Sequence, residues 1–282
     1  MRRNRGLVIS NKVVKDENNS PRGLDRRQFL KFAGIAALAA VAGGSIAKLG
    51  FIKNDVQAED NSTSSNQVLS QHQWAMVIDL RLCDGCGGCT EACSKEHYLT
   101  PGITWIKVYE LTGSLGQKYY LPRPCMQCEN APCLRVCPVH ATYKTPDGVI
   151  VVDQNICIGC RLCMGACPYA ARYFNFKDPP PVPNTLPKPS PEWPVPQIRG
   201  TVGKCVFCIH DTRVGKLPAC VTGCPMQAIY YGDLVTDLAT NGREAYKLST
   251  LIESNDAVRL KEELNTQPRV YYILGHGQDL NF

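Results

Sequence analysis

The chain has 282 residues and 16 cysteines, with 31 Lys and Arg against 25 Asp and Glu, a formal net charge of +6. Residues 1–58 hold 11 of the basic residues and four of the acidic ones, a net +7, so residues 59–282 carry −1. A basic nucleic-acid surface is therefore excluded from the body of the chain. The 44% of hydrophobic residues exclude disorder throughout.

Residues 1–58 carry the features of an export signal in their usual order. The run Asp25 to Lys31 contains paired arginines followed by Phe-Leu-Lys, and it resembles a twin-arginine signal. An apolar stretch rich in Ala and Gly runs from Phe32 to about Ala47, and Val56-Gln57-Ala58 has the small residues of a cleavage site. The segment predicts export to the extracytoplasmic (periplasmic) face by a route that resembles one for folded proteins. Cleavage and retention as an anchor both stay open.

Residues 59–73 are rich in Ser, Asn and Gln, and this composition predicts a flexible lead. After residue 59 no run approaches 18 consecutive apolar residues, so we expect no transmembrane helix there. If the protein works at a membrane, a partner subunit must supply the span.

The cysteines form four groups of four. The first and third groups have the spacing C-x2-C-x2-C-x3-C, the second has C-x2-C-x4-C-x3-C and the fourth has C-x2-C-x11-C-x3-C. Groups two, three and four end in Cys-Pro, whereas Ser94 follows the first group. The spacing C-x2-C-x2-C-x3-C-P is that of bacterial ferredoxins with two [4Fe–4S] clusters, in which the fourth Cys ligates the other cluster. The groups are Cys83, Cys86, Cys89 and Cys93; Cys125, Cys128, Cys133 and Cys137; Cys157, Cys160, Cys163 and Cys167; and Cys205, Cys208, Cys220 and Cys224.

Thiolates at steps of three on one loop can reach three irons of a cubane, and the loop glycines (Gly85, Gly87, Gly88 and Gly159) let backbone N–H groups approach sulfide. Structural zinc would use pairs of cysteines and has no need of a third at the next step. Disulfides suit an exported chain with an even number of cysteines, but disulfide scaffolds are usually short. Buried free thiols do not explain the grouping. The spacing therefore favours iron–sulfur clusters.

Internal repeats indicate duplication. Val77-Ile78-Asp79 precedes Cys83 by the same offset as Val151-Val152-Asp153 precedes Cys157. The pattern C-P-x-x-A-x-Y begins at Cys137, Cys167 and Cys224. Strand-forming runs before each loop and after each final Cys predict strand–loop–helix–strand units. We expect an α+β fold of two duplicated ferredoxin-like modules with short strands, cluster loops and helices.

Two further segments lie between groups three and four and after group four. Residues 178–200 contain nine prolines, which favour an extended strap. This strap is either a spacer on the protein's own surface or a grip on a partner with Trp193 as its anchor. In the C-terminal extension, residues 234–282, composition predicts a helix over 243–264 and a strand over 269–274.

The remaining polar residues predict no chemistry of their own. His97, His140 and His210 lie near cysteine groups, and we expect packing or surface roles for them. We find no Ser/His/Asp set or phosphate loop, so we expect a non-catalytic chain with no active site and no direct small-molecule substrate. Asp84 lies inside the group-one loop, where it either lowers the potential of its cluster or faces solvent with little effect.

From Trp74 to about Leu274 the chain resembles the four-cluster iron–sulfur subunit of dimethyl sulfoxide reductase-type molybdopterin oxidoreductases, closest in style to those of tetrathionate and polysulfide reductases. The four groups, the x11 gap and the closing Gln267-Pro268-Arg269-Val270-Tyr271-Tyr272 carry the resemblance. It implies that residues 74–282 pair groups one and four, and groups two and three. It implies four [4Fe–4S] clusters, held by Cys83, Cys86, Cys89 and Cys224; by Cys205, Cys208, Cys220 and Cys93; by Cys125, Cys128, Cys133 and Cys167; and by Cys157, Cys160, Cys163 and Cys137.

The resemblance also implies partners. Some relatives carry a C-terminal membrane helix that this chain lacks, which favours a separate quinone-reactive integral membrane subunit together with a molybdopterin catalytic subunit. The expected function is electron relay between the two. A free exported polyferredoxin without a fixed partner is the alternative, and an interaction protein stabilised by metal or disulfides is a third reading.

Overall fold

The computed structural model describes residues 72–114 and 116–275, all within the unit Glu59–Phe282. The predicted export segment, 1–58, lies outside the described residues, as do most of the predicted lead, 59–73, and the last residues of the C-terminal extension. None of the described helices has the length and apolar character needed to cross a membrane.

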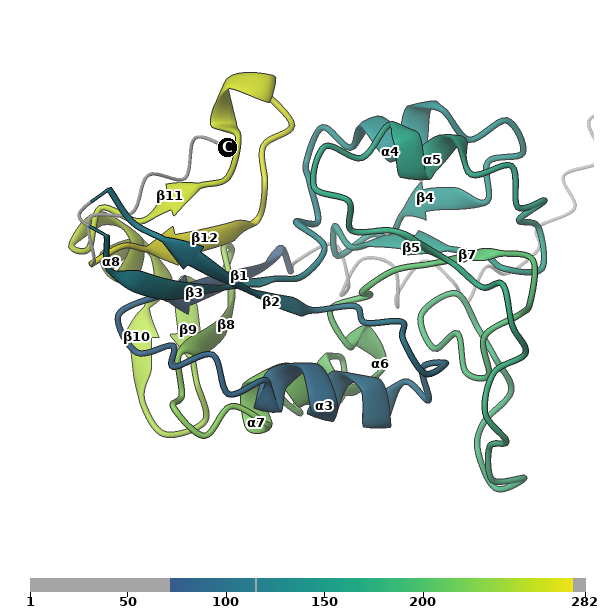
Figure 1. Cartoon of the computed structure of the whole chain (residues 1–282), viewed down its shortest axis with the longest axis horizontal. Helices are drawn as coiled ribbons and strands as arrows, with labels where there is room; N and C mark the ends of the chain where they lie inside the picture. Colours follow the sequence, from purple (N-terminus) through teal and green to yellow (C-terminus); the bar gives the residue numbers. More distant parts are fainter. Residues whose placement is uncertain (1–71, 115, 276–282) are drawn as a thin grey trace, which may run out of the picture. The chain divides into compact units, whose positions relative to one another are not determined.

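The largest sheet has six strands in the order β10-β9-β8-β1-β12-β11 (Figure 1). β1 (Trp74–Asp79) lies near its centre, antiparallel to β8 (Ile229–Asp233) and parallel to β12 (Val270–Ile273). Met76 and Ile78 of β1 face the main core, whereas Ala75 and Val77 pack with α8 (Leu248–Glu253) on the other face. Both faces are therefore buried, which explains the nearly continuous apolar sequence of β1. The outer strands are β9 (Leu238–Thr240), β10 (Ala245–Lys247) and β11 (Val258–Arg259).

Each cysteine group follows a strand and continues into a short helix that carries its third Cys, and another strand follows, as the repeats predict. The strands before the four groups are β1, β3 (Lys118–Arg123), β5 (Ile150–Val152) and β7 (Val202–Gly203). The helices are α3 (Gly88–Glu96), α4 (Pro132–Arg135), α5 (Leu162–Gly165) and α7 (Ala219–Thr222), with α6 (Ile209–Thr212) inside group four. The strands that follow are β2 (Lys107–Thr112), β4 (Thr142–Lys144), β6 (Tyr173–Phe174) and β8. α3 packs against α7, and α4 packs against α5.

The C-terminal extension differs from the prediction. The helix predicted over 243–264 is wrong: this stretch contains β10, the six-residue α8, β11 and the 3-10 helix η1 (Glu262–Leu264). Asp256 and Lys261 adopt positive φ, which interrupts a helix, and the turn at Gly242 folds β10 back onto β9. The strand predicted over 269–274 is confirmed as β12.

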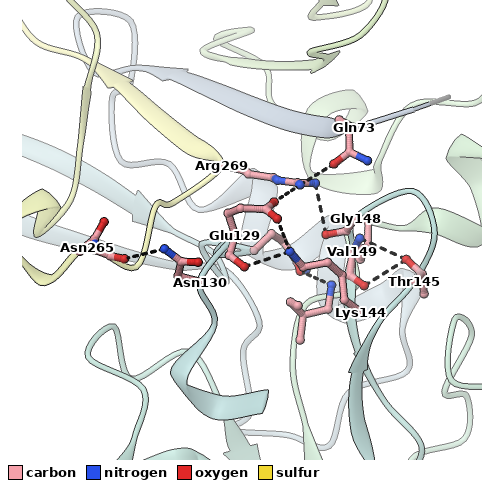
Figure 2. Close-up of polar contacts among 11 residues, drawn as sticks. Gln73, Glu129, Asn130, Lys144, Thr145, Gly148, Val149, Asn265 and Arg269 are labelled. Carbon is pink, nitrogen blue, oxygen red and sulfur yellow. Dashed lines mark hydrogen bonds and ion pairs between the residues drawn. The ribbon is translucent and has the colours of Figure 1, made fainter. Parts of the chain in front are cut away.

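Polar contacts from the end of the C-terminal extension hold the loop of group two in place (Figure 2). The N–H of Glu129 donates to the carbonyl of Gln267 at 2.9 Å, and the N–H of Arg269 donates to the carbonyl of Met126 at 2.9 Å. The Arg269 guanidinium also contacts Gln73 and the Glu129 carboxylate. The closing motif that carries part of the resemblance thus holds the backbone on both sides of Cys128.

The Pro-rich strap lies against its own chain at Trp193. This side chain is 9% exposed, and its ring centroid lies 4.0 Å from that of His210 and 5.7 Å from that of His97. Trp193, the side chain that could have anchored a partner, therefore packs against histidines of this chain. The structure favours the spacer interpretation of residues 178–200.

Candidate metal centres

Three cavities of similar size are each lined by four cysteines. The cavity with Cys125, Cys128, Cys133 and Cys167 has an empty volume of about 330 Å³. Cys83, Cys86, Cys89 and Cys224 line one of about 290 Å³, and Cys137, Cys157, Cys160 and Cys163 line one of about 310 Å³. In every case three cysteines come from one group and the last comes from its partner group.

The remaining four cysteines form a fourth set. The pKa of Cys93 is raised by burial and then by the charges of Cys205, Cys220 and Cys208, and all four cysteines are buried. The structure thus brings all sixteen cysteines into four sets, and their membership equals that implied by the resemblance. That each set ligates iron stays a prediction.

In the repeat C-P-x-x-A-x-Y, backbone N–H groups that follow the Cys donate to its sulfur. Burial opposes ionisation of Cys137, but N–H groups of Thr142, Val139 and Ala141 outweigh it, so the pKa of this thiol is lowered. At Cys167 the N–H groups of Ala171 and Tyr169 occupy equivalent positions, although burial dominates there and raises the pKa. Donors two and four residues after the Cys therefore recur, and they suit a thiolate that carries negative charge.

Burial strongly disfavours the ionised form of the cysteine thiols in the interior. Burial raises the pKa of Cys89 and of Cys128 to about 12, and that of Cys205 to about 11. All sixteen cysteines are free. Four converging soft sulfur donors in a mainly apolar cavity fit a metal group, because the positive charge of a metal compensates buried thiolates. The donor sets therefore fit iron–sulfur clusters.

Two loop glycines are required by close packing as well as by backbone conformation. Gly159 has φ +69, and a Cβ there would lie 2.1 Å from the carbonyl oxygen of Gly200. Gly85 has φ +77, and its Cβ would lie 2.3 Å from the ring of Tyr120. These contacts seat the cysteine loops against neighbouring segments, which the sequence spacing did not indicate.

Electrostatic interactions between thiols of neighbouring sets arrange the four sets in one order, which we call the row. Cys89 of the first set interacts electrostatically with Cys220 of the second, Cys205 of the second with Cys125 of the third, and Cys133 of the third with Cys163 of the fourth. Exposure is greatest at the ends of this row, where Cys86 and Cys160 are exposed, whereas the second set is wholly buried. The arrangement is a path through the interior with an accessible sulfur at each end.

The charged and histidine side chains near the sulfurs divide into interior and surface residues. His97 is buried, with Nε2 3.3 Å from the Cys208 Sγ, and burial followed by repulsion from His210 lowers its pKa to about 3. His140 is exposed. His210 lies 3.3 Å from a carboxylate oxygen of Glu96. Exposed Asp84 accepts a 3.0 Å hydrogen bond from the N–H of Cys86.

Two buried cationic side chains near the cysteines were not predicted from the sequence. Arg172 is 3% exposed, and its Nη2 lies 3.0 Å from the Cys133 Sγ. Lys204 is 1% exposed and donates to the carbonyls of Ile150 and Cys205. Arg172 occupies the variable position before the Tyr of the repeat, so a comparison of the repeat copies could have found it. Lys204 directly precedes the first Cys of group four, and no other signal marks it.

Known proteins place this chain in a family. Residues 117–179 match the family described as "4Fe-4S dicluster domain". The chain is 42% identical to a subunit of the selenate reductase of Mesobacillus selenatarsenatis over 220 residues, 73% of each protein. It is 40% identical to the iron–sulfur cluster-binding subunit of the menaquinone reductase of Nitratidesulfovibrio vulgaris over 232 residues, 71% of this chain and 88% of the relative. It is 34% identical to a subunit of the tetrathionate reductase of Salmonella typhimurium over 255 residues, 88% of this chain and 87% of the relative.

All three relatives are subunits of reductases, and the one from Nitratidesulfovibrio vulgaris is described as iron–sulfur cluster-binding. The protein belongs to the iron–sulfur electron-transfer subunits of dimethyl sulfoxide reductase-type molybdopterin oxidoreductases.

Proposed function

We propose that this chain relays electrons through four [4Fe–4S] clusters between a molybdopterin catalytic subunit and a quinone-reactive membrane subunit. The observation that carries the proposal is the row of four cysteine sets with an exposed sulfur at each end. Each set would hold one cluster, and a bound [4Fe–4S] cluster gains and releases one electron at a time. The chain's own residues bind the iron, donate N–H groups to sulfur and keep water from the interior.

The packing of the helices supports two duplicated modules. α3 of group one packs on α7 of group four, and α4 of group two packs on α5 of group three. The last Cys of each group lies in the set of its partner group, as two-cluster ferredoxin ligation requires. We infer that one ferredoxin-like unit arose twice within this chain.

Both ends of the row offer surfaces for partners. Near Cys160, Ile158 is 64% exposed and Leu162 is 57% exposed; near Cys86, Leu82 is 41% exposed and Met226 is 42% exposed. Exposed apolar side chains beside an electron-transfer site suit protein interfaces. This favours docked partners over a freely diffusing carrier.

The proposed location is the extracytoplasmic (periplasmic) face of a membrane, reached by the twin-arginine route. The support is the ordered signal within residues 1–58. Attachment would come through the membrane partner. Cluster insertion before export matches the buried second set, which the folded chain encloses.

Anaerobic affinity purification from solubilised native membranes tests the two-partner proposal. We expect a molybdopterin subunit and an integral membrane subunit to co-purify with the tagged chain. Ile158→Asp should reduce recovery of one partner, whereas the control Val214→Asp, at a 68% exposed side chain, should not. Recovery of the iron-loaded chain alone would favour the free polyferredoxin.

A further inference from the structure

Arg172 lies between two of the cysteine sets. Its Nη2 donates to the Cys133 Sγ at 3.0 Å, on the side of the third set. Its Nη1 donates to the Thr142 Oγ1 at 3.1 Å, on the side of the fourth set. Thr142 and Cys137 line the cavity of the fourth set together, and the N–H and hydroxyl of Thr142 favour the thiolate form of Cys137. Arg172 and Thr142 thus form a polar bridge from a sulfur of the third set to the lining of the fourth set.

The bridge follows from the internal repeat. In C-P-x-x-A-x-Y the variable position before Tyr is Thr142 in group two and Arg172 in group three. The two modular copies face one another through α4 and α5, so equivalent positions meet between the sets. Thr142 and Arg172 are only 3% exposed.

The guanidinium is buried without a carboxylate partner among the residues that the structure describes. The groups with which it interacts electrostatically are the thiols of Cys133, Cys163 and Cys125. Burying an unpaired guanidinium costs several kcal/mol, and Arg keeps its proton in proteins. The counter-charge must therefore come from the thiolates and whatever they bind.

We propose that Arg172 is a positioning residue that stabilises the reduced state of the clusters in the third and fourth sets, directly at Cys133 and through Thr142 at Cys137. This inference rests on the proposed function. An oxidised cluster with its four thiolates carries roughly −2, and reduction adds one more negative charge. A fixed cation 3.0 Å from a ligand sulfur favours the added electron.

The electron balance is simple. One electron leaves one of the two sets, which is oxidised, and enters the other, which is reduced. No bond forms or breaks, and Arg172 keeps its proton. Because one cation serves both sets, it raises the two reduction potentials together.

Potentiometric titration followed by EPR, on the anaerobically purified complex, tests this role. Arg172→Gln should lower the reduction equilibrium constant of both sets at least tenfold, a midpoint shift of about 59 mV for a one-electron couple. Arg172→Lys keeps the positive charge but loses the guanidinium, which donates N–H groups in two directions. We therefore expect a smaller midpoint shift, mainly in the fourth set. Cys128→Ser and Cys160→Ser assign the signals to the third and fourth sets.

Two further variants sharpen the test. Thr142→Val removes only the hydroxyl and should lower the midpoint of the fourth set alone, by less than tenfold. Arg135→Gln removes an exposed charge two residues from Cys133 and should change both equilibrium constants less than twofold. If the Arg172→Gln protein loses iron, the midpoint of the fourth set in the Thr142→Val protein tests the inference instead.

Full iron content with unchanged midpoints in Arg172→Gln, or in Thr142→Val where it decides, would overturn the inference. A wild-type protein without [4Fe–4S] signals would instead overturn the proposed function. The two failures are therefore distinguishable.

Discussion

The two halves of the described chain use the same repeat but surround their sulfurs differently. In the half built from groups two and three, the position before the repeat Tyr holds Thr142 and Arg172, and a cation touches sulfur. In group four the same position holds Ile229, which lines the cavity of the first set. The buried cation of that half, Lys204, is held by two backbone carbonyls.

The histidine of the first half adds to the contrast. His97 Nε2 lies 3.3 Å from the Cys208 sulfur, and burial lowers the pKa of His97 to about 3, which favours the neutral imidazole. A shared backbone frame therefore fixes where the sulfurs lie, while a few side chains set the charge around them. We expect the second half to hold its clusters at the higher potentials.

Loss of a buried ligand in the first half has the largest expected effect. Cys220→Ser should lose one cluster, about four of about 16 irons, because Cys220 is buried and solvent has little access to replace the lost sulfur ligand. Cys86→Ser, at the exposed end of the row, should retain more iron. Iron analysis with EPR checks both variants, and equal iron content would contradict the difference in exposure.

Breaking the contact between the two halves has the second-largest expected effect. Buried Asp147 accepts hydrogen bonds from Arg213 at 3.0 and 3.1 Å and from the Trp74 indole at 3.2 Å. Asp147→Asn should cost about 3 kcal/mol, the lower end for a broken buried pair, since Arg213 stays partly exposed. That corresponds to a fall of roughly 6–12 °C in apparent Tm.

The exposed pair Asp178–Arg199 provides the control, and Asp178→Asn should leave the apparent Tm unchanged. Burial opposes ionisation of Asp147, but hydrogen bonds from Arg213 and Thr145 prevail and lower its pKa below 3.8. The unfolded state therefore binds more protons as the pH falls through and below 3.8, and this contribution is lost there. An Asp147→Asn protein as stable as wild type at pH 7 would refute the link between the halves.

Exchanging the repeat position tests the comparison itself. Ile229→Thr gives group four the residue of group two, and its hydroxyl should stabilise the reduced first set as Thr142 is expected to do for the fourth. We expect a rise of less than tenfold in the reduction equilibrium constant. The control Ile229→Val should leave the midpoint unchanged and cost about 0.5–1.5 kcal/mol of stability. A lowered midpoint in Ile229→Thr would show that this position does not set the potential.

Asp84 has the smallest expected effect. Its carboxylate is exposed and accepts the N–H of Cys86, and solvent screens such a charge. Asp84→Asn keeps the acceptor and should change the equilibrium constant of the first set less than twofold in a redox titration. A tenfold rise would show that the carboxylate holds this potential down.

The local signals predicted much of this molecule. Cysteine spacing and the Cys-Pro repeats indicated the groups, the strands that flank them and the final strand, because these depend on short-range pattern. The fate of residues 243–264 could not be read from composition, since pairing with β9 and β12 overrides helix propensity. The burial of Trp193 and Lys204 could not be predicted, because distant segments create their surroundings, whereas a comparison of the repeat copies could have found Arg172.

The central claim is that four sets of four thiolates each hold a cubane cluster. Iron and sulfide analysis of the anaerobically purified protein, with EPR after dithionite reduction, tests it most directly. We predict about 16 irons and 16 sulfides per chain with interacting [4Fe–4S] signals. A colourless, iron-free protein containing zinc or disulfides would contradict the claim.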